Sequence, residues 1–305
     1  MTAVSYLPFS HESRPLGKSN FTISPIAWGM WRFGNETVPE ARAKVDAALE
    51  AGITLFDTAD IYGFDGQQGF GDAEAQLGRV FAEDKSLRGK MVLASKGGIS
   101  IGVPYDQSAA YIQSAIDASL SRLGVDRIDL WQVHRPDILT HPAEVARALE
   151  DAKSAGKIGA IGVSNFTVAQ ISALQHFLDE PLVSVQPELS ALQIEPIENG
   201  LLDQSMMMET TVLAWSPLGQ GRIADPSTQR EKDVAAALDL VAHAYGVSRS
   251  AAAYSWIMAH PARAIPIIGS QQIARIKEAT DAFKVRWTRA DWYQVLIASR
   301  QEPLP

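Results

Sequence analysis

Among the ionisable side chains of this sequence, Asp57, Tyr62, Lys96 and His134 are of types that could together hold and transfer a proton. A carbonyl that accepts a hydride develops negative charge on its oxygen and needs a proton donor nearby. Tyrosine can donate, and a neighbouring ammonium lowers its ordinary pKa of about 10, while a carboxylate keeps that ammonium charged and in place. A histidine can orient the carbonyl oxygen through a hydrogen bond. The four residue types together predict a catalytic cluster for carbonyl reduction.

Each of these residues also has an ordinary structural explanation when it is considered alone. Asp57 could cap a turn, Lys96 could leave a sheet at the surface, His134 could be structural, and Tyr62 could be a packing residue. The four residues can therefore act as one catalytic cluster only if the fold brings them together.

Short apolar runs that alternate with longer amphipathic stretches predict that fold. The runs are rich in Val, Ile and Leu, as expected for strands buried on both faces of a parallel sheet. The predicted strands are Ile26–Gly29, Thr54–Asp57, Met91–Lys96, Ile128–His134, Ile158–Ser164, Val183–Gln186, Val212–Ser216 and Ala264–Gly269. Helical patterns lie between them, at Pro39–Ala51, Ser108–Leu123, Thr167–Leu178 and Val234–Tyr245.

Eight βα units of this size predict a single α/β domain, a (β/α)8 TIM barrel spanning residues 1–305. An open doubly wound sheet would carry a glycine fingerprint after its first strand, and the residues at 30–34 do not match it. Two segments lie outside the eight units. Leu16–Ser24 is expected to form an N-terminal hairpin closing the bottom of the barrel, and Thr288–Ser299 an extra C-terminal helix.

The composition limits the partners. With 46% hydrophobic and 20% charged residues, a net charge of -8 and no cysteine, the chain suits a globular protein without disulfides. The negative charge argues against nucleic acid and anionic membranes, and no signal peptide or membrane span is evident. We expect a cytoplasmic enzyme with a small-molecule carbonyl substrate and no metal; the oligomeric state is not determined by the sequence.

In a barrel of this kind the catalytic groups collect where the strands end and the βα loops begin. Polar or glycine residues stand at these ends in almost every unit. They are Asp57, Lys96, His134, Ser164, Asn165, Gln186, Ser216, Gly269 and Ser270.

These same positions carry a family resemblance. Phe56 to Gly63 reads Phe-Asp-Thr-Ala-Asp-Ile-Tyr-Gly and resembles the Asp-Thr-Ala-x-x-Tyr-Gly signature of the aldo-keto reductases. Residues 130–134, 162–166 and 214–219 resemble the strand-four, strand-five and strand-seven motifs of that family, in order. The resemblance runs from about residue 17 to 283, and residues 134–137 and 214–222 are similar to a bacterial branch of uncharacterised aldo-keto oxidoreductases.

The resemblance implies NADPH-dependent reduction of an aldehyde or ketone to an alcohol, with Tyr62 as general acid and base. Asp57 and Lys96 would tune Tyr62, and His134 would position the carbonyl. Ser164, Asn165 and Gln186 would hold the nicotinamide carboxamide. The full set implied to bind the cofactor is Gly29, Met30, Trp31, Asp57, Ser164, Asn165, Gln186, Trp215, Ser216, Pro217, Leu218, Gly219, Gly221, Ile268, Gly269, Ser270, Gln272, Arg275 and Glu278.

The adenosine end departs from the family pattern. Ser270 and Arg275 match residues that grip a 2′-phosphate, but Gly269 replaces a common lysine and Ala279 a common asparagine. NADP(H) is therefore the expected cofactor, with NAD(H) as the alternative.

The resemblance also places the substrate pocket, formed by Trp31, Tyr62, Phe64, His134 and Arg135. The glycine-rich segment Asp65–Gly71 is either a cover for this pocket or a disordered loop. The substrate itself is not specified by the sequence.

Three other functions compete. A Schiff-base aldolase would explain Lys96 but not the cofactor motifs, and a metal-dependent hydrolase lacks paired ligands. An NADPH-binding redox-sensing or regulatory subunit with slow turnover is the remaining alternative.

Overall fold

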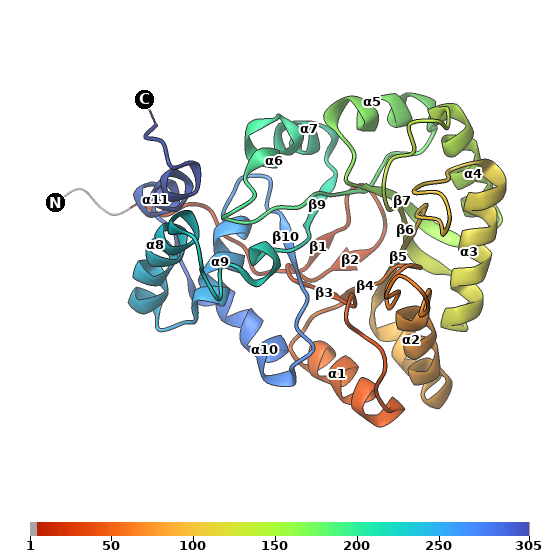
Figure 1. Cartoon of the computed structure of the whole chain (residues 1–305), viewed down its shortest axis with the longest axis horizontal. Coiled ribbons are helices and arrows are strands. Elements are labelled where there is room, and N and C mark those ends of the chain that lie inside the picture. The colour runs from red at the N-terminus through yellow and green to blue at the C-terminus, as the bar shows by residue number, and fades with distance from the viewer. Residues whose placement is uncertain (1–4, 305) are drawn as a thin grey trace.

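The computed structural model describes residues 5–304, and its centre is a closed barrel of parallel strands (Figure 1). The hydrogen-bonded order is β10-β3-β4-β5-β6-β7-β8-β9, so each strand lies beside the next one along the chain and β10 closes the ring. This confirms the predicted eight-stranded barrel. The strands are β3 (Ala27–Gly29), β4 (Leu55–Asp57), β5 (Val92–Gly97), β6 (Ile128–Val133), β7 (Ile158–Ser164), β8 (Ser184–Gln186), β9 (Thr211–Ala214) and β10 (Ile265–Ile268).

Helices surround the barrel. The α-helices are α1 (Val38–Glu50), α2 (Asp72–Glu83), α3 (Ala109–Leu123), α4 (Pro142–Ser154), α5 (Val168–Phe177), α6 (Glu195–Glu198), α7 (Leu201–Met208), α8 (Gln229–Tyr245), α9 (Arg249–Met258), α10 (Ile273–Glu278) and α11 (Arg289–Arg300). Three short 3₁₀ segments join them, η1 (Lys85–Lys90), η2 (Gly219–Gly221) and η3 (Ala279–Lys284). Within residues 5–304, no helix is both long and apolar enough to cross a membrane.

Capping residues fix where the predicted helices begin. Thr37 and Thr167 each form a reciprocal capping box, and Ser108 caps α3, so these helices start within a residue or so of the prediction. Helix α8 starts five residues earlier than predicted. The reason is a third capping box, in which Thr228 and Glu231 satisfy each other's backbone amides ahead of the apolar pattern.

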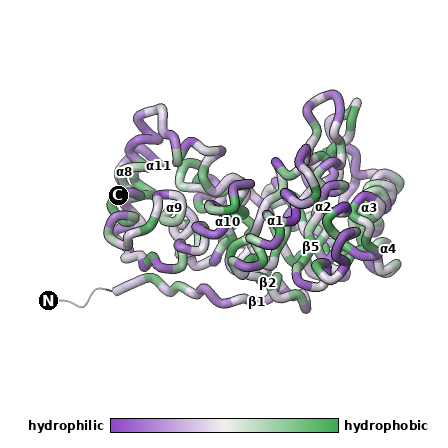
Figure 2. The backbone as a smooth tube through the Cα atoms, turned by 90° about the horizontal axis from the view of Figure 1, so that it is seen from below, coloured by the Kyte–Doolittle hydropathy of each residue, from purple (hydrophilic) through white to green (hydrophobic). Residues whose placement is uncertain are grey.

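The N-terminal hairpin is present, with shifted boundaries. Its strands are β1 (Arg14–Pro15) and β2 (Thr22–Ile23), so the predicted segment held the turn and the second strand only. Leu16 and Ile23 are fully buried in the cluster that fills the barrel interior. The hairpin lies along the lower edge of Figure 2, and loops project from the opposite side.

The C-terminal helix is also confirmed, one residue later than predicted. Thr288 caps α11, and Trp292, Val295 and Leu296 are buried. Trp292 stacks on Trp256 of α9 with ring centroids 4.8 Å apart, and each indole N–H donates to the other residue's carbonyl oxygen. Helix α11 lies beside α8 at the side of the barrel away from α3 and α4 (Figure 1).

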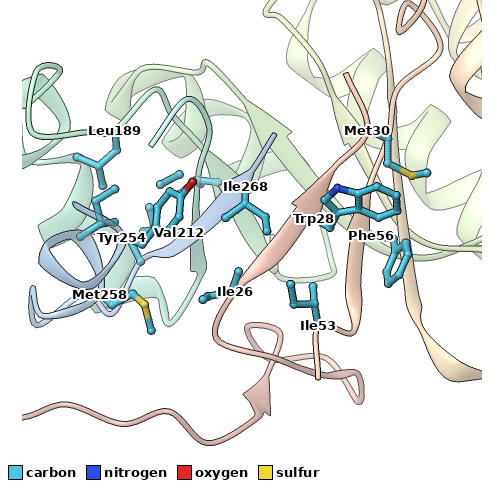
Figure 3. Close-up of a cluster of buried hydrophobic side chains, with 14 of the residues drawn as sticks. Ile26, Trp28, Met30, Ile53, Phe56, Leu189, Val212, Tyr254, Met258 and Ile268 are labelled. Carbon is cyan, nitrogen blue, oxygen red and sulfur yellow. The ribbon is translucent and has the colours of Figure 1, made fainter. Parts of the chain in front are cut away.

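Alternation along the strands separates two cores. In β4, Leu55 belongs to the cluster inside the barrel and Phe56 to the larger cluster between barrel and helices. The same alternation places Ala27 and Ile267 inside and Trp28 and Ile268 outside. Figure 3 shows part of the outer cluster. A strand residue two positions after an inward-facing one therefore also faces the barrel interior. This alternation shows which residues at the strand ends point into the barrel.

Candidate active site

Three strands end with polar side chains on the inner face of the barrel. Asp57, Lys96 and Gln132 each follow an inward-facing apolar residue by two positions, after Leu55, Ala94 and Leu130 respectively. All three are buried. Because parallel strands end at the same rim, these side chains converge.

Lys96 and Asp57 form a fully buried ion pair. Lys96 Nζ lies 2.6 Å from Asp57 Oδ2 and donates a second hydrogen bond, of 2.8 Å, to the carbonyl oxygen of Thr58. The other carboxylate oxygen, Oδ1, accepts hydrogen bonds from Gln186 at 3.0 Å and from Gln132 at 3.4 Å. Burial alone would lower the pKa of Lys96, but Asp57 and Tyr62 outweigh it, and the net effect is a raised pKa.

Tyr62 lies over this ion pair. Lys96 Nζ is 4.8 Å from the centroid of the Tyr62 ring, whose edges contact Trp31 and His134. Burial raises the pKa of Tyr62 above its ordinary value, and the Lys96 ammonium opposes that rise only in part. Lys96 therefore acts on the pKa of Tyr62 in the expected direction, but desolvation of the phenolate is the larger effect.

His134 is held at the end of β6 by its backbone. Its amide donates to the Gly97 carbonyl at 2.8 Å, and its carbonyl accepts from the Asn165 side chain at 3.0 Å. Burial first, then Lys96 and Arg135, lower the pKa of His134 well below its usual range. The imidazole is thus neutral near pH 7, with one N–H donor. The buried Nδ1 atom has no hydrogen-bond partner within the described part of the chain.

A cavity of about 910 Å³ opens above these groups. It extends from Tyr62 and His134 to α10, and most residues predicted for the cofactor or substrate line it. Those residues are Gly29, Trp31, Asp57, Tyr62, His134, Arg135, Ser164, Asn165, Gln186, Trp215, Ser216, Pro217, Leu218, Gly221, Gly269, Ser270, Gln272, Arg275 and Glu278. Lys96 is not part of the lining; it lies behind Asp57 and Tyr62.

Four predicted residues do not line the cavity. Met30 and Ile268 have the outward parity and belong to the core between barrel and helices (Figure 3). Phe64 packs on Phe70, with ring centroids 6.0 Å apart. Gly219 is buried, and a Cβ on it would lie 3.0 Å from the Leu192 side chain.

The segment Asp65–Gly71 forms hydrogen-bonded turns and does not line the cavity. Asp65 Oδ1 accepts from the amides of Gln67 and Gln68, each at 2.9 Å. Gly69 approaches Gly63 so closely that a Cβ on it would lie 2.3 Å from the Gly63 carbonyl oxygen. In this structure the segment is therefore held by its own hydrogen bonds and lies outside the cavity lining.

Three polar residues at the inner end of the cavity are already partly bonded. Asn165 donates to Ser164 Oγ and to the His134 carbonyl, and its own oxygen accepts from the Trp215 indole at 2.9 Å. Ser164 donates to the Gln186 carbonyl at 2.9 Å. The capacity left on Ser164, Asn165 and Gln186 consists of acceptor oxygens, since their polar hydrogens are engaged. This end of the cavity can bind a group that presents N–H donors.

The outer end has a different character. Gly269 leaves open space where a side chain would stand, and Ser270 is fixed by the Trp28 indole, which donates to its carbonyl at 3.0 Å. Arg275 is exposed at the rim, and no acid of residues 5–304 pairs with it. An unpaired guanidinium beside a hydroxyl can bind a phosphate.

Several lining residues were missed by sequence reasoning. Ile267 comes from β10, and the others come from α9 and from loops on both sides of the rim: Arg32, Gln220, Ala224, Ser248, Ser250, Ala251, Tyr254 and Gln271. Ala279, which the sequence singled out at the adenosine end, lines the cavity as well. Ile267 could have been found from strand parity, because Ile268 faces outward. The others have no local signal, since only the packing of α9 and the loops brings them to the cavity.

Comparisons with known proteins give a consistent result. Residues 25–298 match the model of the aldo/keto reductase family. The chain is 62% identical to a 6-dehydroglucose reductase of Novosphingobium aromaticivorans, covering 99% of this chain and 100% of that one. It is 36% identical to a 6-dehydroglucose reductase of Agrobacterium fabrum, covering 90% and 93%, and 32% identical to the oxidoreductase YdhF of Escherichia coli, covering 93% and 96%.

A solved structure shares the fold. It is that of a thermostable aldo-keto reductase, Tm1743, in complex with the inhibitor epalrestat, and it superimposes with a TM-score of 0.82. The sequence identity is 21%, and 94% of this chain and 99% of that chain are covered.

Proposed function

The chain belongs to the aldo/keto reductase family and is an oxidoreductase, and on that premise we propose that it reduces the aldehyde of 6-dehydroglucose with NADP(H). The substrate is taken from the relative that is 62% identical along its whole length. The observation that carries the catalytic part is the fully buried Lys96–Asp57 ion pair beneath Tyr62, at the inner end of a large cavity. We take residues 1–305 as one catalytic domain and the location as cytoplasmic.

In this proposal Tyr62 gives its hydroxyl proton to the carbonyl oxygen of the substrate. Lys96 supplies the positive charge that stabilises the resulting phenolate, and Asp57 keeps Lys96 charged and fixed. Neutral His134 donates its N–H to the same oxygen, which orients the carbonyl. In the reverse reaction the phenolate accepts the proton of the alcohol.

The residues present fit a nicotinamide cofactor, which members of this family use. The acceptor oxygens of Ser164, Asn165 and Gln186 match the N–H groups of a carboxamide. Ser216 to Gly221 would hold the pyrophosphate, since Gly221 has φ +96° and no atom within 4 Å of a Cβ position. Ser270, Gln272, Arg275 and Glu278 would hold the adenosine end. When bound, the cofactor supplies the hydride.

The substrate end suits a polyhydroxylated aldehyde. Arg135 lies over the Trp215 ring at 5.9 Å, is half-buried, and pairs with no acid among residues 5–304. Trp31, 58% exposed, stands on the other side of Tyr62. A guanidinium with free donors on an aromatic ring can bind the hydroxyl groups of a sugar. The regulatory-subunit alternative has no observation in its favour, because the catalytic cluster is complete.

The direct test is a steady-state assay with 6-dehydroglucose and NADPH, followed by NADPH absorbance and by detection of glucose. We expect turnover, and Tyr62→Phe should reduce kcat by about 10²- to 10⁴-fold while leaving NADPH binding intact. Full activity in Tyr62→Phe would contradict the mechanism. Turnover of simple aldehydes without turnover of 6-dehydroglucose would contradict the substrate.

The NADP(H) assignment has its own test. Arg275→Ala should raise the KM for NADPH about tenfold, the loss of one charge-assisted contact, and leave the KM for NADH unchanged. Lys277→Ala is the matched control, because Lys277 lies on the same helix but pairs with Glu50 at the surface. Equal effects of Arg275→Ala on both cofactors would contradict a 2′-phosphate contact.

A further inference from the structure

A second group of buried polar side chains lies on the outer face of β5, against α2 and α3. Ser95 alternates with Lys96, so it faces the helices while Lys96 faces the barrel interior. Glu74 of α2 is fully buried and accepts a hydrogen bond from the Ser95 hydroxyl. Arg122 of α3 places both Nε and Nη2 2.7 Å from Glu74 Oε2. Glu74 is thus fully paired.

Asp60 is the unpaired member of this group. It is 1% exposed, and in the part of the chain described neither carboxylate oxygen has a partner of good hydrogen-bond geometry. The adjacent Ile61 amide lies close enough to lower its pKa, but it is a weak, poorly aligned contact. A Cβ on Gly97 would lie 3.0 Å from Asp60 Oδ2 and 2.7 Å from the Trp131 indole ring, so the carboxyl is packed against backbone and ring. A buried carboxylate without partners is costly, and a neutral carboxylic acid costs far less.

The charges around Asp60 point the same way. The groups that face it are Glu74 from α2, Arg122 and Tyr111 from α3, and Lys96 from β5. Burial, and after it Glu74, raise the pKa of Asp60 well above its ordinary value, and the cations oppose this only in part. The Arg122 guanidinium is the nearby cation for both carboxyl groups, Asp60 and Glu74, and it is hydrogen-bonded to Glu74.

Asp60 is also connected to the catalytic cluster. Its amide donates to the carbonyl oxygen of Lys96 at 3.0 Å, and it stands two residues before Tyr62. In the described chain Asp57 is the only carboxylate that pairs with Lys96. A charge on Asp60 would add a second anion that acts on the Lys96 ammonium, and a Lys96 ammonium shared with another anion stabilises the Tyr62 phenolate less.

We propose that Asp60 is a positioning residue that carries a proton because Glu74 occupies Arg122, and that this proton leaves Asp57 as the single anion acting on Lys96 and Tyr62. The proposal rests on the proposed function of Tyr62 for its effect on catalysis. The presence of the proton does not depend on it.

The test removes the proton from Asp60 through a substitution that keeps the size and shape of the neighbouring Glu74 side chain. Glu74→Gln removes the competing charge, so Asp60 becomes the natural partner of Arg122 and ionises. The alkaline limb of kcat/KM for carbonyl reduction should then move to higher pH. Alcohol oxidation at pH 7, which needs the phenolate, should slow about three- to tenfold for one added charge nearby. The double variant Glu74→Gln/Asp60→Asn should restore the wild-type pH profile, and Asp60→Asn alone should not shift it.

A second readout works even if the Glu74 variant folds poorly. Infrared difference spectra of wild type against Asp60→Asn should show the C=O stretch of one protonated carboxylic acid, shifted in D₂O, at neutral pH. Absence of that band would overturn the proposal. A pH profile that moves in Asp60→Asn alone, or fails to return in the double variant, would also overturn it. If the band is present but Tyr62→Phe keeps full activity, the proposed function fails and the proton assignment stands.

Discussion

Strand β5 separates two buried groups of charged side chains that balance their charge differently. On its inner face, Asp57 and Lys96 are both inaccessible and the cation has direct hydrogen bonds to the protein. On its outer face, Glu74 pairs with Arg122, whose side chain is 23% exposed, and Asp60 has no partner. The two groups lie on adjacent residues, with Lys96 facing in and Ser95 facing out.

The difference follows from what each group can reach. A buried carboxylate needs a cation or a proton, because transferring its charge out of water without either is strongly unfavourable. The inner group has a dedicated lysine and faces the cavity, where a substrate can meet it. The outer group has one cation for two acids and is closed off by α2 and α3. Four variants test this comparison.

Removing the inner cation should have the largest effect. Lys96→Met leaves Asp57 buried without a counter-charge, which should lower the free energy of unfolding by about 3–5 kcal/mol and kcat by about 10²- to 10⁴-fold. Urea unfolding and the reductase assay measure these. The double variant Lys96→Met/Asp57→Asn should recover most of the stability and none of the activity. A single variant as stable as wild type would contradict the inner pair's dependence on Lys96.

Removing the outer cation should cost less and spare catalysis. Arg122→Met should lower the free energy of unfolding by about 1–3 kcal/mol, because the Arg122 side chain is partly solvated. We expect kcat to stay within about threefold of wild type. Arg300→Met, which breaks an exposed pair with Glu198, is the control and should change stability by less than about 1 kcal/mol. Loss of turnover in a folded Arg122→Met variant would contradict the inference that the group on the outer face of β5 contributes to stability and not to catalysis.

Replacing Asp60 with the neutral side chain of Asn should stabilise the protein relative to wild type, and increasingly so as the pH rises. The pKa of the Asp60 carboxyl is raised in the folded state. The stability that this carboxyl contributes is therefore fully present below its unfolded-state pKa of about 3.8, and it is lost as the pH rises through its folded-state pKa. The advantage of Asp60→Asn over wild type in free energy of unfolding should therefore grow between pH 5 and pH 8, by about 3–4 kcal/mol if Asp60 stays protonated up to neutral pH. A constant difference over that range would contradict a raised pKa.

His134 should show the opposite dependence, with the smallest effect. Its pKa is lowered in the folded state, so its contribution is present above the unfolded value of about 6.5 and is lost as the pH falls toward the folded value. Wild type should lose on the order of 1 kcal/mol between pH 7 and pH 5 that His134→Gln does not lose. Parallel stability curves for the two proteins would show that folding does not lower the pKa of His134.

Much of the inner group could be predicted from the sequence. The barrel follows from eight apolar runs with helical patterns between them, and Asp57, Lys96 and His134 stand at the ends of three of those runs. Since parallel strands in a barrel share one rim, chain position alone brings these residues together. The Tyr62 position follows from the motif resemblance.

The tertiary structure decided the rest. Strand parity moved Met30 and Ile268 from the cavity into the outer core, and packing of α9 brought Ser248, Ser250 and Tyr254 to its lining. Whether a carboxyl is paired cannot be seen from residue order, because it depends on cations from other elements and on burial. The sequence therefore predicted which residues form the inner group. The fold alone determined that Asp57 has a cation, that Asp60 has none, and that desolvation raises the pKa of Tyr62.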